Sequence, residues 1–98
     1  MRNLVDVVRE KVGRLVDPET GLTFSEMRLV REIHEIEAGV IRVDFRPSSP
    51  VCPIALKLAM DIKKAVLDVE GIGKALVYCR DHTMEKTIND LVNSTSEE

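Results

Sequence analysis

The residue best placed for chemistry is Cys52, which precedes Pro53 and a long amphipathic segment. Proline suits the first position of a helix, so this order predicts Cys52 at the N-cap, facing unpaired N–H groups and the positive end of the helix dipole. There the pKa of a cysteine can fall from about 8.5 to roughly 3.5–7.5, giving a thiolate that binds metal or carries a persulfide. The competing interpretation is a small buried side chain that only caps the helix. Ser48 and Ser49 place hydroxyl groups near any group that Cys52 holds.

Cys79 and His82 form a Cys-x-x-His pair at the end of a predicted strand. Together with Cys52 they would supply three ligands to zinc or to an iron-sulfur cluster. However, Cys79 alternates with Ala75 and Val77 along the strand, which is the pattern of core residues. A single Cys-x-x-His pair, without a second pair of ligands, does not specify a zinc site. We therefore rank Cys52 first among the candidate ligands, ahead of Cys79 and His82.

Three carboxylates, Asp17, Glu19 and Glu26, are candidates for general acid or base chemistry. Asp17 precedes Pro18, and this pair is typical of a turn that ends a helix, which is the interpretation we favour. The sequence contains no Gly-rich phosphate loop and no H-E-x-x-H motif. A thiol enzyme using Cys52 as its nucleophile ranks last among the functional classes, because no histidine or arginine lies at a fixed spacing that would activate it. We expect a protein without enzymatic activity.

The composition limits the partners. With 14 basic and 17 acidic residues the net charge is -3, the wrong sign for a nucleic-acid-binding surface. No uncharged stretch approaches the ~20 apolar residues of a membrane span, and the charged N-terminus has no secretory signal, so we expect a cytoplasmic protein with free thiols. The 98 residues, 44% of them hydrophobic, suffice for a single domain over 1–93. The polar tail, 94–98, is expected to be disordered.

Hydrophobic periodicity predicts the elements that must position these residues. Asn3 is a good N-cap for the first helix, Gly71 a good C-terminal cap for the second, and Thr83 caps the last. The stretch leading to 27 is expected to be irregular or a single helical turn opened by Ser25. The pattern places helices at 3–15, at 53–70 and from Thr83 onward, and strands at 29–36, 40–46 and 74–79.

The segment 29–36 is ambiguous, because Leu29, Val30, Ile33 and Ile36 also fit one face of a helix. The local pattern slightly prefers that helix. A strand at 40–46 would then have no nearby partner, so we predict a hairpin of two strands. The resulting order is helix-strand-strand-helix-strand-helix.

Several of these features together resemble one family, the small metal-sulfur cluster biosynthesis proteins. This SufT-like and PaaD-like family includes the eukaryotic cytosolic iron-sulfur targeting subunit, and the resemblance extends from about residue 4 to about residue 80. Its pattern is D-P-E, then D-L-G-L-V before the first strand, then a T-x-P-x-C-P loop. The positions that match are Asp17, Pro18, Glu19, Glu26, Leu29, Val30, Ser49, Pro50, Cys52 and Pro53.

The sequence departs from the family pattern at three places. Arg28 replaces a glycine, Val51 replaces a frequent glycine beside the cysteine, and Asp81-His82-Thr83 stands where an aromatic residue often follows the third strand. The resemblance supports the strand at 29–36, because the family fold has a hairpin and a third strand packed on helices. It implies an α/β chain of the α+β two-layer type with a small three-stranded mixed sheet packed on helices.

The resemblance implies an accessory factor in iron-sulfur cluster assembly or delivery, which holds iron or a cluster transiently through Cys52. Its partners would be an iron-sulfur carrier, an assembly ATPase or apo-target proteins, and a homodimer would let two Cys52 thiolates share one cluster. The alternative is an interaction module that docks onto a multisubunit enzyme or an assembly ATPase, with Cys52 in a structural role.

Overall fold

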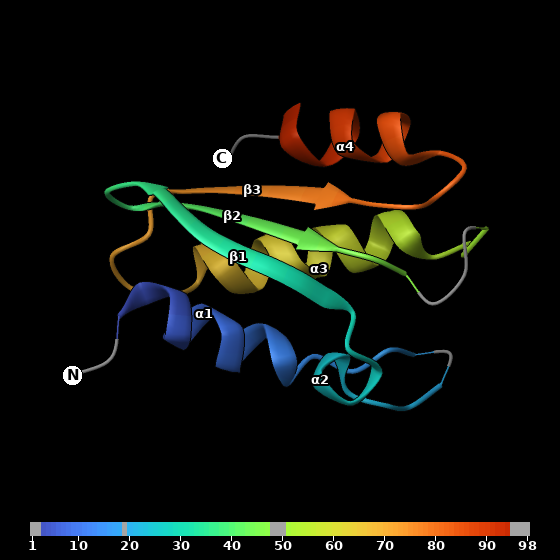
Figure 1. Cartoon of the computed structure of the whole chain (residues 1–98), viewed down its shortest axis with the longest axis horizontal. Helices are drawn as coiled ribbons and strands as arrows, with labels where there is room; N and C mark the ends of the chain where they lie inside the picture. Colours follow the sequence, from blue (N-terminus) through green and yellow to red (C-terminus); the bar gives the residue numbers. More distant parts are fainter. Residues whose placement is uncertain (1–2, 19, 48–50, 95–98) are drawn as a thin grey trace.

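The computed structural model describes residues 3–18, 20–47 and 51–94. The order of elements confirms the predicted fold class, with one additional short helix between the first helix and the first strand (Figure 1). The segment that also fitted a helical face is a strand. The elements are α1 (Leu4–Gly13), α2 (Phe24–Met27), β1 (Val30–Glu37), β2 (Val40–Phe45), α3 (Ala55–Leu67), β3 (Lys74–Cys79) and α4 (Glu85–Ser94).

The sheet has the strand order β1-β2-β3. β1 and β2 form an antiparallel hairpin, and β3 pairs parallel to β2 after the crossover through α3. In this register Phe45, the last residue of β2, lies opposite Cys79, the last residue of β3. The chain segments that follow β2 and β3 therefore leave the sheet at the same end (Figure 1).

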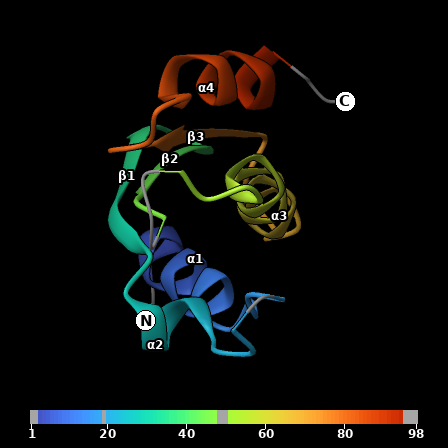
Figure 2. The ribbon, with the colours of Figure 1, turned by 90° about the vertical axis from the view of Figure 1, so that its right-hand side faces the viewer.

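One face of the sheet builds the core with α1 and α3 (Figure 2). Ile41, Val43 and Phe45 alternate along β2 and are fully buried. They share one core with the buried sides of the helices, including Val12 of α1 and Ile62 of α3. Each such side chain contributes about 1.5–3 kcal/mol through burial, so this face accounts for most of the packing energy.

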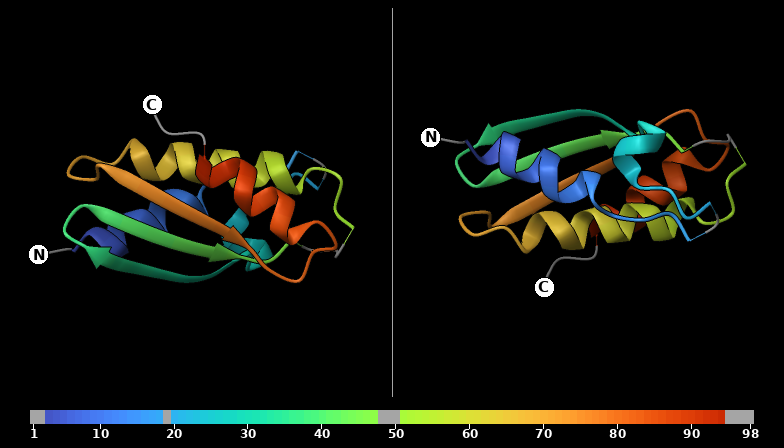
Figure 3. Two further views of the ribbon diagram at one scale, coloured as in Figure 1. Left: turned by 90° about the horizontal axis from the view of Figure 1, so that it is seen from above. Right: turned by 90° about the horizontal axis from the view of Figure 1, so that it is seen from below.

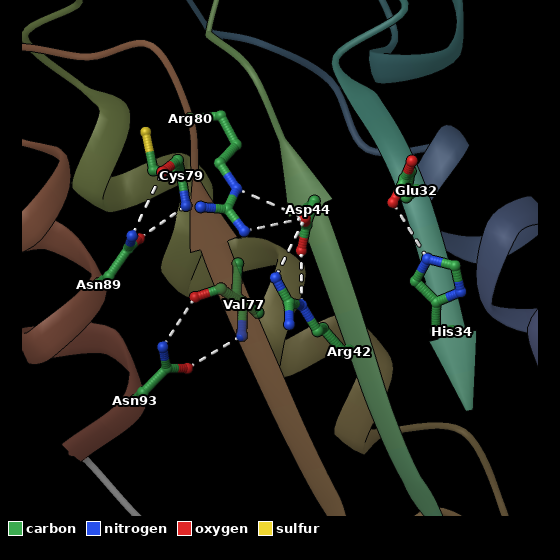
Figure 4. A network of polar contacts seen from close by, with 9 residues as sticks. All are labelled: Glu32, His34, Arg42, Asp44, Val77, Cys79, Arg80, Asn89 and Asn93. Carbon is green, nitrogen blue, oxygen red and sulfur yellow. Dashed lines mark hydrogen bonds and ion pairs between the residues drawn. The ribbon is translucent and has the colours of Figure 1, made fainter. Parts of the chain in front are cut away.

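The opposite face of the sheet carries polar side chains, which agrees with the predicted two-layer arrangement. Asp44 is almost buried there and accepts hydrogen bonds from Arg42 at 3.0 Å and Arg80 at 3.2 Å (Figure 4). The Arg42 guanidinium also lies 4.4 Å from the centre of the Tyr78 ring. The two cations compensate the desolvation of the carboxylate, which stays paired on this face.

The helix α4 covers the edge of β3 that β2 does not use (Figure 3). The Asn93 side-chain amide accepts from the Val77 N–H and donates to the Val77 carbonyl, both at 2.9 Å. Asn89 does the same for Cys79, at 2.6 and 3.2 Å. Four residues along a helix rise about 6.0 Å and two along a strand about 6.6 Å, so the two amides match successive outward-facing groups of β3. They replace the neighbouring strand that this edge lacks.

Several predicted boundaries were wrong by a few residues. α1 begins after the Asn3 N-cap, as predicted, but ends at Gly13 instead of residue 15. The next residues pair with the chain before α2 instead of continuing the helix. The Leu15 carbonyl accepts a hydrogen bond from the Phe24 N–H, and Val16 forms a β-bridge with Thr23. The two strands of the hairpin lie at 30–37 and 40–45 instead of 29–36 and 40–46, whereas the strand at 74–79 matches.

The ends of the two later helices also differ from prediction. α3 spans 55–67 rather than 53–70, with Asp68 as its C-cap, so Gly71 lies in the connection to β3. α4 begins at Glu85, two residues after Thr83, and extends to Ser94, the first residue of the predicted tail. The rest of that tail lies outside the described residues.

Candidate functional site

The parallel pairing of β2 and β3 brings the three predicted ligand residues to one end of the sheet. Cys52 lies in the loop after β2, Cys79 ends β3, and His82 lies in the turn before α4. The His82 Nε2 is 2.9 Å from the Cys52 carbonyl oxygen. The Cys52 thiol also lies near enough to Cys79 for its charge to affect the Cys79 pKa. Residues separated by about 30 positions in sequence thus form one cluster.

The predicted position of Cys52 at the helix N-cap was wrong. The N-cap of α3 is Ile54, which makes no side-chain cap, and Pro53 lies in the turn before it. The Cys52 carbonyl accepts the Ala55 N–H at 3.3 Å, so the backbone turns once before the helix begins. The thiolate stabilisation expected from an N-cap therefore has no basis in this geometry. Cys52 is 7% exposed.

His82 ties two loops together. Its Nδ1 accepts the Met84 N–H at 2.9 Å, so the ring is assigned as the neutral tautomer in which Nε2–H donates to the Cys52 carbonyl. Both ring nitrogens are engaged, and a metal ligand needs a free one. Ligation by His82 would require one of these bonds to break. In this arrangement His82 positions the Cys52 loop.

We expect replacement of His82 by alanine to loosen the Cys52 loop. A lost hydrogen bond costs about 1 kcal/mol, which corresponds to about a fivefold larger population of open loop. In a background where Cys79 is replaced by alanine, the rate of Cys52 alkylation by iodoacetamide should rise about fivefold. Thr83→Ala, which changes the exposed neighbour, is the control and should leave the rate unchanged. An equal rate in His82→Ala and its parent would show that His82 does not hold the loop.

Cys79 is fully buried on the core face of β3. Burial, followed by the negative charges of Glu85, Cys52 and Asp81, raises the pKa of its thiol to about 11. At neutral pH the thiol is protonated, and its backbone N–H and carbonyl are paired with Asn89. A metal ligand must be the thiolate, so Cys79 is poorly suited to that role in the folded chain.

The raised pKa of Cys79 predicts a loss of stability at alkaline pH. Below pH 9 the thiol is protonated in both folded and unfolded chains and has no effect. Between pH 9 and 11 only the unfolded chain loses the proton, which favours unfolding. From pH 8 to 10.5 urea denaturation should show the free energy of unfolding falling by about 2 kcal/mol more in the wild type than in Cys79→Ala. Parallel pH dependence in the two proteins would contradict the raised pKa.

The acidic residues of the motif serve turns in this structure. Asp17 is buried, and its backbone closes the loop after α1: its N–H donates to the Leu22 carbonyl at 2.9 Å and its carbonyl accepts from Gly21 at 2.8 Å. Glu26 accepts from the Thr23 N–H at 2.9 Å, and these hydrogen bonds from Thr23 lower the pKa of Glu26. The predictions for Glu19, Ser48, Ser49 and Pro50 lie outside the described residues.

Two features near the site were missed from the sequence although each has a signal. Thr23-x-x-Glu26 is the capping-box pattern, and Thr23, not Ser25, opens α2. Asn89 and Asn93 are four residues apart, which is the spacing of one helix face. That spacing alone does not reveal what the face contacts, since the free strand edge is formed by the tertiary fold.

Neither a preformed metal cage nor a membrane span occurs in the part of the chain that the structure describes. Within 3–18, 20–47 and 51–94, no three His, Cys, Asp or Glu side chains are grouped so as to hold a metal ion. Over the same ranges no helix is long and apolar enough to cross a membrane. A metal ion bound by Cys52 would therefore need further ligands from outside these described side chains.

Comparison with known proteins shows similarity to a protein family, to a curated protein and to a solved structure. A family model described as iron-sulfur cluster assembly protein matches residues 6–77. The uncharacterized protein MJ1129 of Methanocaldococcus jannaschii is 31% identical over 78 residues, which cover 80% of this chain and 82% of that protein. A crystal structure from Bacillus anthracis, titled as the domain of unknown function DUF59, has a TM-score of 0.73 at 17% identity, over 91% of this chain and 87% of the other.

The structural match agrees with the order of elements. The family match extends from α1 into β3 and so includes Cys52 and the loop that carries it. The likeness to the Bacillus anthracis domain shows that the fold is shared. The chain belongs to the iron-sulfur cluster assembly protein family.

Proposed function

We propose that this chain is a non-enzymatic accessory factor of the SufT-like and PaaD-like kind, which acts in the cytoplasm and passes iron or an iron-sulfur cluster to other proteins through Cys52. The observation that carries the proposal is the difference between the two thiols. Cys79 is fixed in a strand, fully buried and protonated, whereas Cys52 lies in a loop between the exposed residues Val51 and Pro53. The hydrogen bond from His82 to the Cys52 carbonyl holds that loop, and it must break before the loop can open.

A single thiol suits transient handling of this cargo. Soft thiolate ligands favour iron-sulfur clusters, and the Cys52 thiol loses its proton when it binds iron. A closed four-ligand site would retain the cargo, whereas one protein ligand lets it leave. The remaining ligands would come from an iron-sulfur carrier, from the apo-target protein, or from Cys52 of a second copy.

A docking role is the second candidate, and a specific observation favours it. The outer side of α3 exposes Leu56, Met60 and Leu67, which are spaced as on one helix face. The neighbouring α4 exposes Leu91, and the exposed Met84 lies directly before the first residue of that helix. Exposed apolar side chains on adjacent helices are typical of protein interfaces. The partner would be an assembly ATPase or a multisubunit enzyme.

The substitution Cys52→Ser separates the two functions. The chain is co-purified with an assembly ATPase, and both the amount bound and the iron in the complex are measured under anaerobic conditions. If Cys52 holds the cargo, the variant binds as much ATPase as the wild type but the complex loses its iron. If Cys52 is only structural, the iron content of the complex does not change.

A further inference from the structure

A cleft of about 470 Å³ is lined by residues of α1, α2 and the start of β1, and Cys52 is not among them. These three elements lie next to one another in the ribbon (Figure 3). Three arginines line it: Arg9 from α1, Arg28 directly after α2, and Arg31 from β1. Phe24 and Val30 supply apolar surface to the same cleft, and none of the described residues that line it is acidic. Three positive charges thus gather in one hollow of a chain whose net charge is -3.

The arginines of the cleft have no ionic partner among the described residues, unlike two basic residues at the C-terminal end of α1. Lys11 pairs with Asp68 at 2.7 Å, and Arg14 lies 3.7 Å from Glu10. The nearby carboxylate of Glu26 is engaged by Thr23 in the capping box. Three like charges repel one another in a shared hollow, so their grouping does not stabilise the fold.

The backbone conformation of Arg28 does not favour an arginine at this position, so the residue does not serve to stabilise the fold. Arg28 follows α2 with φ 55° and ψ 40°, in the left-handed region. Glycine or asparagine normally occupies this position at a helix end, because a Cβ is strained there. A strained arginine that forms no ion pair with a described residue is typical of a binding site.

We propose that this cleft binds a small anion with at least two negative charges, of the phosphate-ester or polycarboxylate class. The planar guanidinium group donates paired hydrogen bonds to oxygens of both kinds. The cleft is of a size that accepts a small ligand. At the α1 end, Asp6 and Glu10 border the adjoining hollow, and these carboxylates would repel a longer anion. This proposal does not depend on the role of Cys52.

The test is calorimetric titration of the full chain with inorganic pyrophosphate and, separately, with citrate in 150 mM NaCl. We expect Arg28→Gly and Arg31→Gln each to weaken binding by about tenfold, since a hydrogen bond to a charged group has about that effect. Arg28→Gly should also raise the melting temperature because it removes the strained Cβ, so weaker binding by that variant does not reflect unfolding. Arg46→Gln, an arginine outside the cleft that pairs with Asp81, is the matched control.

Each outcome of the titrations either supports an anion-binding site in the cleft or overturns it. Tight binding of pyrophosphate alone supports a phosphate ligand, tight binding of citrate alone supports a polycarboxylate, and similar binding of both supports an oxyanion site selective for charge only. Equal weakening by Arg46→Gln would show nonspecific attraction and would overturn the proposal. Binding of neither probe by the wild type would also overturn it, and an acidic protein segment would then be the next partner to test.

Discussion

Replacing Asn89 and Asn93 together by alanine should lower the free energy of unfolding by about 3–5 kcal/mol. Each side-chain amide pairs with both the N–H and the carbonyl of one residue at the edge of β3. Alanine leaves these four backbone groups without partners under α4, at a cost of about 1–3 kcal/mol for each one that water cannot reach. Since small domains have total stabilities of about 5–15 kcal/mol, this is a large fraction.

Chemical denaturation of the double variant tests this expectation. Alanine has a higher helix propensity than asparagine, so α4 itself becomes a better helix and any loss of stability must come from the strand edge. Thr87→Ala, at an exposed position of the same helix, gives the matched control and should be as stable as the wild type or slightly more stable. Stability of the double variant equal to that of Thr87→Ala would show that the two amides do not support β3.

Hydrophobic patterning predicted most elements of the fold, because the buried faces of α1, α3 and β3 depend on local spacing. It slightly favoured a helix at 29–36, because Ile33 and Ile36 are spaced as on one helix face, whereas in the strand Ile33 is buried and Ile36 is exposed. Pairing with β2 decides in favour of the strand, and that is a tertiary effect. The end of α1 was misplaced for a similar reason, since Val16 bridges to Thr23 rather than continuing the helix.

The candidate site was less predictable than the fold. The sequence indicated Cys52, Cys79 and His82 as residues of interest, but their grouping depends on the parallel pairing of β2 and β3. Pro53 suggested an N-cap for Cys52, whereas the chain makes one more turn before α3 starts. The linking role of His82 and the burial of Cys79 are properties of the packed chain, and spacing alone does not encode them.

The second large effect that we expect is on the binding of iron and sulfide. The substitution Cys52→Ser should remove nearly all of both from the protein. A serine hydroxyl is a hard and weakly acidic group, so it does not replace a thiolate toward an iron-sulfur cluster. Cys79→Ala should retain the cargo, because the Cys79 thiol is buried and its pKa is about 11. The two variants each remove one thiol and thus control for each other. Circular dichroism spectra equal to that of the wild type should show that both variants are folded.

The most direct test of the role of Cys52 is anaerobic reconstitution with iron and sulfide. Wild type, Cys52→Ser and Cys79→Ala are treated in parallel, with glutathione present to supply the remaining thiolate ligands, and then assayed for visible absorption, iron and sulfide. The proposed function predicts a coloured, iron-containing wild type and Cys79→Ala protein beside a colourless Cys52→Ser protein. A wild type as colourless as Cys52→Ser, or a Cys52→Ser protein that holds as much iron and sulfide as the wild type, would contradict cargo binding at Cys52.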